Sequence, residues 1–188
     1  FRRAVLRRDR TEEEWDRKIY RSAYGACHDE IVADIQWFFE KKPEEVSIRS
    51  RDGLRLRGYY LEAPEAKGCV LLFHGFRSKG VMDFAMVLPE LYENGYSMLV
   101  VDQRAHGRSE GKYIGYGILE RYDCQQWAFY MDAKTGGRVP LVLEGVSMGA
   151  ATVMMAAELP MPKSVRGIVA DCGYNSAWAE VRHCIHKW

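Results

Sequence analysis

The run 141–151 joins an apolar, strand-like stretch to a helix-like stretch of small residues through the pattern Gly-x-Ser-x-Gly. This context predicts a nucleophile elbow, a sharp strand-to-helix turn that exposes a serine hydroxyl above the edge of a sheet. Gly145 and Gly149 carry no Cβ, so the strand and the helix can approach closely around a strained Ser147. The N–H of Met148, in the first turn of the helix, then points toward whatever the serine attacks.

The bulk composition is that of one ordinary globular domain. The 188 residues are enough to bury a single core. A net charge of +1 provides no electrostatic attraction for nucleic acid, so we expect no nucleic-acid partner. No apolar stretch is long enough to cross a bilayer. The cysteines are odd in number and scattered, which favours buried free thiols in a reducing, cytoplasmic compartment over a disulfide framework or a zinc site. They are Cys27, Cys69, Cys124, Cys172 and Cys184.

The beginning of the chain leaves its location open. Because the chain starts at Phe1 rather than at a methionine, an upstream signal or membrane anchor stays an alternative, and with it a secreted or membrane-anchored protein. Residues 1–10 hold five arginines and one aspartate. We interpret this stretch as the solvated face of a helix, with a juxtamembrane basic flank as the alternative.

Two helices are predicted ahead of the main domain. The run 11–14, Thr-Glu-Glu-Glu, is a capping box that opens a helix through about Tyr24. A second helix is predicted over Asp29–Lys41. Its apolar residues are Ile31, Val32, Ile35, Phe38 and Phe39. Residues 1–45 are therefore expected to form an N-terminal helical extension packed on the domain 46–188.

The remaining residues change from helical to extended periodicity and then alternate. Two strand-like runs, 46–50 and 54–61, flank Asp52-Gly53, a strong hairpin signal. Further strands are expected at 69–73, 96–101, 139–143 and 165–170, and helices at 82–93, 118–132, 148–158 and 175–186. Pro89 should bend or split the first of these helices. Strands alternating with helices predict an α/β fold, a mostly parallel sheet with helices on both faces.

Three motifs in this order resemble the α/β-hydrolase superfamily. The run 71–76 is a buried strand ending in His-Gly, the run 102–111 reads Asp-Gln-Arg-Ala-His-Gly-Arg-Ser-Glu-Gly after the next strand, and the serine turn follows. More narrowly, these motifs with the runs 52–54 and 171–174 are similar to bacterial serine hydrolases of the esterase/lipase type that carry an N-terminal helical extension. The resemblance covers residue 46 to the end.

This resemblance implies a site and a substrate class. It assigns Ser147 as the nucleophile, and it matches the backbone N–H groups of Met148 and Phe76 to the two oxyanion donors. Two aligned N–H groups stabilise charge that exists only in the tetrahedral intermediate, and losing one costs about 3–4 kcal/mol of barrier. The expected substrate is a small acyl ester, with thioesters and peptides open as well. Nothing in the sequence suggests a cofactor or a metal site.

The acid and the histidine of a triad are expected beyond Trp188. In this superfamily they follow the nucleophile on later strand ends, whereas this chain stops one helix past the strand 165–170. Two further strands, the acid loop and the histidine loop should follow. We therefore expect an incomplete α/β-hydrolase fold, the N-terminal portion of a hydrolase, which is inactive by itself.

The titratable residues already present receive structural interpretations. His74 and His106 shape turns, Asp171 caps the next helix, and Asp102 and Arg104 fix loops. Surface or helix-face roles are expected for His28, His183 and His186, and core positions for Trp127, Phe129 and Tyr130.

Two functions from different classes follow. The first is a serine hydrolase that cleaves carboxylic esters or related acyl bonds through an acyl-enzyme on Ser147. The alternative is a catalytically incompetent fragment or an interaction module that retains the hydrolase scaffold. In that case the open edge of the strand 165–170 would invite self-association.

Overall fold

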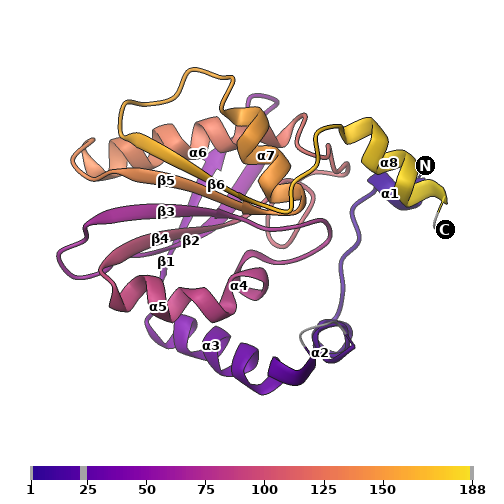
Figure 1. Ribbon diagram of the computed structural model, residues 1–188, viewed down its shortest axis with the longest axis horizontal. Helices are drawn as coiled ribbons and strands as arrows, with labels where there is room; N and C mark the ends of the chain where they lie inside the picture. The colour runs from indigo at the N-terminus through magenta and orange to yellow at the C-terminus, as the bar shows by residue number, and fades with distance from the viewer. Residues whose placement is uncertain (1, 22–24, 187–188) are drawn as a thin grey trace.

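The computed structural model describes residues 2–21 and 25–186, and its strands form one mixed six-stranded sheet of order β1-β2-β4-β3-β5-β6 (Figure 1). β1 and β2 form the predicted antiparallel hairpin, and β2 also pairs antiparallel with β4. The pairs β3–β4, β3–β5 and β5–β6 are parallel, which confirms the mostly parallel sheet. The strands are β1 Glu44–Arg49, β2 Arg55–Leu61, β3 Gly68–Phe73, β4 Tyr96–Asp102, β5 Leu141–Val146 and β6 Val165–Asp171.

Helices cover both faces of this sheet, as the alternation of elements predicts (Figure 1). α6 and α7 pack on one face, whereas α3, α4 and α5 pack on the other. The central strand β3 supplies both cores, because Leu71 and Phe73 face the α6–α7 side while Val70 and Leu72 face the opposite side. The helices are α3 His28–Glu40, α4 Gly80–Asp83, α5 Leu88–Glu93, α6 Glu120–Thr135 and α7 Met148–Ala156. No helix within the described ranges has both the length and the apolar character to span a bilayer.

Pro89 splits the predicted helix 82–93. The segment consists of α4, a 3₁₀ turn η2 at Ala85–Val87, and α5. Pro89 lies in the first turn of α5, where its missing N–H would have no partner within the helix. Two short helices, α4 and α5, therefore replace the single helix predicted here.

The N-terminal helices carry the predicted capping box. In α2, Glu12–Tyr20, the Thr11 hydroxyl accepts the N–H of Glu14 at 3.2 Å and the Glu14 carboxylate accepts the N–H of Thr11 at 3.0 Å. The helix ends earlier than predicted, and residues 22–24 lie outside the described part. A 3₁₀ turn η1, Gly25–Cys27, leads into α3. Of the apolar residues predicted for this helix, Phe38 is fully buried, whereas its neighbour Phe39 is 42% exposed.

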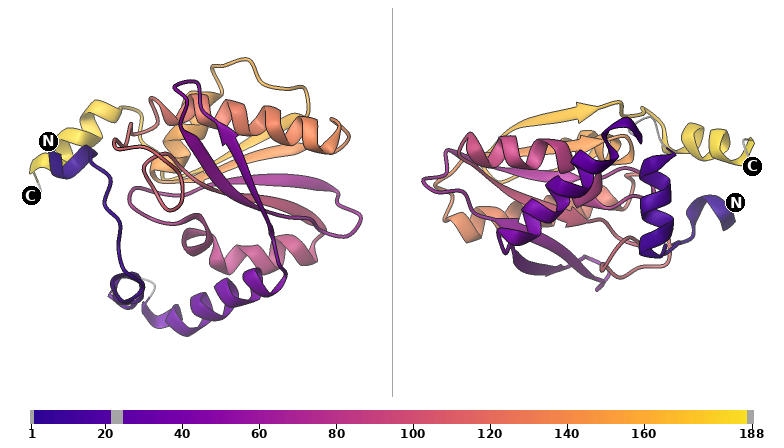
Figure 2. Two further views of the ribbon diagram at one scale, coloured as in Figure 1. Left: turned by 180° about the vertical axis from the view of Figure 1, so that it is seen from behind. Right: turned by 90° about the horizontal axis from the view of Figure 1, so that it is seen from below.

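The first residues of the chain pack on the domain instead of presenting a solvated face. α1, Arg2–Val5, lies beside α8, Ala177–His186 (Figures 1 and 2). Ala4 is buried, and its carbonyl accepts the Tyr116 hydroxyl at 2.9 Å. Leu6 forms an isolated antiparallel bridge with Tyr113. The interpretation of residues 1–10 as a solvated helix face is therefore corrected.

The strand β6 is the least covered strand. Ile168 and Val169 on β6 are 36% and 49% exposed. Within the described ranges β6 pairs only with β5, so its outer edge offers unpaired backbone groups.

The described cysteines are free thiols. Cys69 and Cys124 are buried, as predicted, whereas Cys172, directly after β6, is exposed.

Candidate active site

The direction in which the chain crosses the sheet changes between the neighbouring strands β3 and β5. Phe73 at the end of β3 stands opposite Gly145 near the end of β5. The helix segment after β3 covers one face and α7 after β5 covers the other, so the two connecting loops diverge (Figure 1). In open α/β sheets such a switch point leaves a crevice at the carboxyl ends of the strands. Ser147 and the loop that follows His74 both lie at this point.

The backbone at Ser147 has an unusual conformation. Its φ of 54° and ψ of −112° are sterically unfavourable for a residue with a side chain. Two glycines allow it: a Cβ on Gly145 would overlap the backbone of Gly149, and a Cβ on Gly149 would overlap the carbonyl of Phe73. The N–H of Ser147 donates to the carbonyl of Asp171 at 2.8 Å, which ties the turn to the end of β6.

Ser147 lies at the edge of a cavity. Ser147 is half-buried, and its hydroxyl makes no hydrogen bond to the described residues. It borders a cavity of about 270 Å³. The other residues that line this cavity are Lys18, Ile19, Ile31, Met82, Asp83, Phe84, Met86, Val87 and Val146.

Two backbone N–H groups near Ser147 have no hydrogen-bond partner in the described part of the chain, those of Met148 and Phe76. Met148 is the next residue, and Phe76 follows Gly75, where a Cβ would lie 3.4 Å from the Cβ of Ser147. Met148 is the first residue of α7, where an orphan N–H is expected. The neighbours of Phe76 are both anchored. The N–H of Gly75 donates to the Asp83 carboxylate at 2.8 Å, and the N–H of Arg77 donates to Nε2 of His106 at 3.0 Å. The loop after β3 is thus held on either side of an unpaired N–H.

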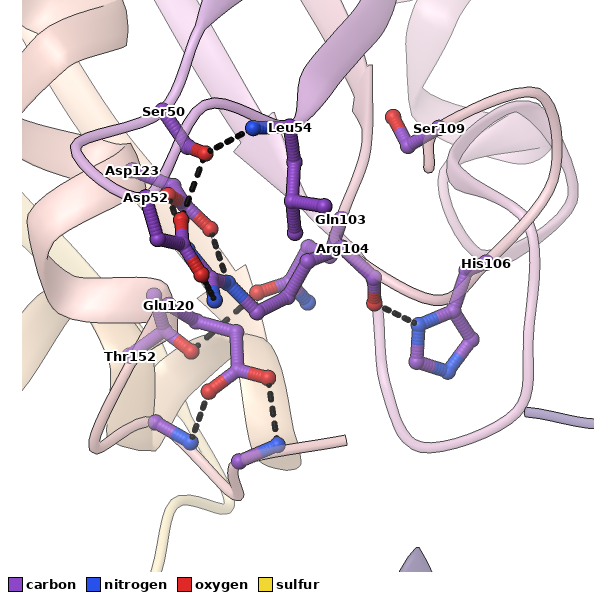
Figure 3. A network of polar contacts seen from close by, with 12 residues as sticks. Ser50, Asp52, Leu54, Gln103, Arg104, His106, Ser109, Glu120, Asp123 and Thr152 are labelled. Carbon is purple, nitrogen blue, oxygen red and sulfur yellow. Dashed lines mark hydrogen bonds and ion pairs between the residues drawn. The ribbon is translucent and has the colours of Figure 1, made fainter. Parts of the chain in front are cut away.

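The ring of Phe76 restrains the loop after β3 as well. This ring stacks on the ring of Tyr116 with 5.2 Å between the centroids. The buried carboxylate of Glu120 accepts the N–H groups of Gly115 and Gly117 at 2.7 and 2.9 Å, which fixes the turn that carries Tyr116 (Figure 3). Burial raises the pKa of Glu120.

The two central histidines are committed to backbone contacts. His106 accepts the N–H of Arg77 through Nε2, so its Nδ1, 2.9 Å from the carbonyl of Arg104, carries the proton and donates (Figure 3). His74 likewise accepts the N–H of Gln103 at 3.1 Å and donates to the carbonyl of Gly75 at 2.8 Å. Burial, and then His74, hold the pKa of His106 well below its ordinary value.

Neither histidine therefore has a free nitrogen with which to accept a proton from Ser147. No hydrogen bond joins the Ser147 hydroxyl to the described side chains of His28 or His183. His28 contacts the carboxylate of its neighbour Asp29, and His183 is exposed on α8. The structural interpretation of His74 and His106 is confirmed.

Arg104 fixes loops through two carboxylates. Its guanidinium contacts Asp123 on α6 at 2.6 Å and Asp52 in the β1–β2 turn at 3.0 Å (Figure 3). Burial opposes the charge of Arg104, but hydrogen bonds to Asp123 and Asp52 outweigh it and raise its pKa. Hydrogen bonds from Arg104 and then Ser50 lower the pKa of Asp52 to about 2.

The structure also tests the roles predicted for two aspartates and two aromatic residues. Asp102 accepts the N–H of Arg108 at 3.0 Å, so its loop-fixing role is confirmed. The prediction that Asp171 caps the next helix is wrong, because α8 begins at Ala177 and the Ser176 hydroxyl accepts the N–H of Ala179 at 3.2 Å. Asp171 has an exposed side chain, and its carbonyl accepts the N–H of Ser147. Trp127 is buried in the core, but Phe129 is 48% exposed and its predicted core position is wrong.

Asp83 and the N-terminal helices are parts of the site that sequence reasoning missed. Asp83 holds both Gly75 and Ser78 in the loop after β3. Lys18, Ile19 and Ile31 bring α2 and α3 to the cavity. No local pattern signals these roles, because each partner lies on a different element and the contact exists only after the sheet has formed.

Comparison with known proteins places the chain in a family. The family model of serine aminopeptidase S33, Hydrolase_4, matches residues 64–184, well over half of the chain. The Bacillus subtilis (strain 168) protein YqkD is 27% identical over 127 residues. Caffeoylshikimate esterase of Arabidopsis thaliana is 26% identical over 149 residues.

Solved structures agree with this assignment. The Pyrococcus furiosus esterase Pf2001 matches 70% of this chain with a TM-score of 0.61 and 27% identity, and 50% of that chain is covered. The carboxyl esterase of Bacillus coagulans, at 18% identity and a TM-score of 0.57, shares the fold over 66% of this chain and 42% of its own.

The coverage of these relatives is partial. The matched regions span 68% and 70% of this chain but only 41% and 45% of the two curated relatives. The sheet order, the turn at Ser147 and the family match agree with one another. The chain belongs to the serine aminopeptidase S33 family of the α/β-hydrolase superfamily.

Proposed function

We propose that the protein containing this chain is a serine hydrolase that cleaves carboxylic esters through an acyl-enzyme on Ser147. One observation carries the proposal. A serine in a strained strand-to-helix turn borders a cavity, and the N–H groups of Phe76 and Met148, near this serine in the folded chain, have no partner in the described residues. The names of two similar proteins, a caffeoylshikimate esterase and the Pyrococcus furiosus esterase Pf2001, support an ester substrate over a peptide.

The proposed reaction has two halves. A general base takes the proton of the Ser147 hydroxyl while its oxygen attacks the ester carbonyl carbon, and the N–H groups of Phe76 and Met148 stabilise the oxyanion. The C–O bond breaks, and the alcohol leaves with the proton. Water then attacks the acyl-enzyme by the same route and releases the carboxylic acid. Because His74 and His106 are engaged, we assign the base to a residue outside the described ones.

A fluorophosphonate probe on the full protein tests this proposal, because it labels an activated serine covalently. We expect labelling of the wild type and loss of labelling in Ser147→Ala. Ser47→Ala is the matched control, since Ser47 is exposed on β1 and its loss should leave labelling intact. Equal labelling of Ser147→Ala and the wild type would remove Ser147 from the mechanism. The 188-residue chain by itself should turn over p-nitrophenyl acetate poorly, because a serine without its base is a weak nucleophile.

The alternative is an interaction module that keeps the scaffold without catalysis. The uncovered β6 favours it, with Ile168 and Val169 exposed beside an edge that no described strand pairs. Ser147-dependent turnover by a monomeric protein in light scattering would exclude this alternative.

A further inference from the structure

The N-terminal helices form one side of the cavity at Ser147. Lys18 and Ile19 from α2 and Ile31 from α3 line it together with Ser147 and Val146 at the end of β5. Figure 2 shows α3 running along the domain beside the helices that follow β3, with α2 lying across its N-terminal end. A group attached to Ser147 would therefore touch residues more than one hundred positions earlier in the chain.

The walls of this cavity are mostly apolar. The segment 82–87 contributes Met82, Phe84, Met86 and Val87, which line the cavity together with Ile19 and Ile31. The two charged side chains are engaged with the loop after β3. The amine of Lys18 donates to the carbonyl of Arg77 at 3.3 Å, and Asp83 accepts from Gly75 and Ser78. Such a lining favours a hydrocarbon group over a charged one.

The size of the cavity limits the length of that group. At roughly 30 Å³ for each water-sized group, the volume of about 270 Å³ holds about nine non-hydrogen atoms. Ile19 and Met82 also line a second, larger groove of about 1060 Å³. Ile19 is buried and packs with Ile31, Ala85 and Met82, so this cluster separates the two spaces.

We propose that α2 and α3 form the acyl-chain subsite of the Ser147 site, and that it accepts an unbranched aliphatic acyl group of about eight carbons. Ile19 is the partition that sets the upper limit of chain length. The subsite rests on the proposed ester hydrolysis for its substrate, but the cavity and its walls are present whether or not the base is supplied.

Two substitutions should move the chain-length preference in opposite directions. In the full protein, Ile31→Phe fills the cavity, so the ratio of kcat/KM for p-nitrophenyl octanoate over acetate should fall at least about 10-fold. Ile19→Ala opens the partition toward the larger groove, so the ratio for hexadecanoate over octanoate should rise by a similar factor. Val32→Phe is the matched control, because Val32 lies next to Ile31 but lines only the larger groove.

A binding measurement separates the subsite from catalysis. Calorimetric titration of Ser147→Ala with octanoate should show binding that the further substitution Ile31→Phe weakens at least about 10-fold and Val32→Phe does not. If the wild type cleaves no ester but octanoate binds in this way, the proposed function fails and the subsite stands. If esters are cleaved with a profile that neither Ile31→Phe nor Ile19→Ala changes, in variants with wild-type thermal unfolding, the subsite is overturned.

Discussion

At the scale of the residue, Gly149 and Gly145 leave no room for a side chain where β5 turns into α7. Gly149 lies against the carbonyl of Phe73, so the helix can begin directly over the central strand. Met148, whose N–H has no partner among the described residues, follows Ser147 as the first residue of this helix. Strain at Ser147 is therefore held by packing that the two glycines permit.

Gly149→Ala should destabilise the protein by at least about 1–3 kcal/mol, because the new methyl group overlaps the backbone of β3. Urea unfolding measures the loss, and fluorophosphonate labelling of Ser147 should fall with it. Gly167→Ala on β6 is the control, since a Cβ there meets nothing within 4 Å and the free energy of unfolding should stay within about 0.5 kcal/mol. Equal stability of the two variants would contradict the steric argument.

His106 is a positioning residue for the oxyanion loop, since it accepts the N–H of Arg77 next to Phe76. His106→Ala should lower kcat by up to about 100-fold with a smaller change in KM, because a displaced donor weakens transition-state binding. His106→Gln should restore part of kcat, since an amide oxygen can accept the same N–H. His183→Ala, on the exposed face of α8, should match the wild type. A purely structural role would change stability without this split between kcat and KM.

At the scale of the element, Arg104 joins the β1–β2 turn to α6 through Asp52 and Asp123. The pKa of Asp52 is lowered from 3.8 to about 2 in the folded protein. A lowered carboxyl pKa stabilises the folded state above the unfolded value, and this stabilisation is lost as the pH falls from about 4 to about 2. The side chain of Asp52 is 55% exposed, so solvent screening keeps its contribution below about 1 kcal/mol.

Asp52→Asn should therefore lower the free energy of unfolding slightly at pH 7 and flatten its fall between pH 4 and pH 2. Urea unfolding across this pH range measures both effects. Glu93→Gln, which removes an exposed carboxylate at the end of α5, is the control and should keep the wild-type slope. The same acid slope in Asp52→Asn and the wild type would show that the pair with Arg104 does not stabilise the turn.

At the scale of the whole molecule, the strands at the centre of the sheet are buried and the strands at its two edges are largely exposed. β3 and β4 are buried along their length, whereas most of β6 is exposed. We propose that the outer edge of β6 pairs with a second copy of this chain when no other strand covers it.

Val169→Lys on β6 should then shift the 188-residue chain toward the monomer in light scattering, because a lysine at an edge strand opposes strand pairing. Phe129→Lys is a matched control, since Phe129 on α6 is exposed to the same degree, 48% against 49%. A wild-type chain that is monomeric at high concentration would refute self-association through β6.

Much of the fold was predictable because its signals are local. The capping box at Thr11, the Asp52-Gly53 hairpin and the split at Pro89 each depend on a few neighbouring residues and are found where predicted. Positions of single aromatic residues were less predictable. Phe39 and Phe129 occur in helices of the expected period yet are exposed, because burial depends on which elements pack against the helix.

Sequence alone determined the strand, the serine turn and the helix at Ser147, because glycine spacing and apolar periodicity act over a few residues. It also placed Phe76 after its strand. Tertiary structure decided what surrounds the serine. Only the strand order β4-β3-β5 brings the loops after β3 and β5 together, engages both nitrogens of His74 and His106, and sets α2 and α3 against the cavity. Contacts between residues so distant in the chain depend on packing, and packing has no signature in a local run of residues.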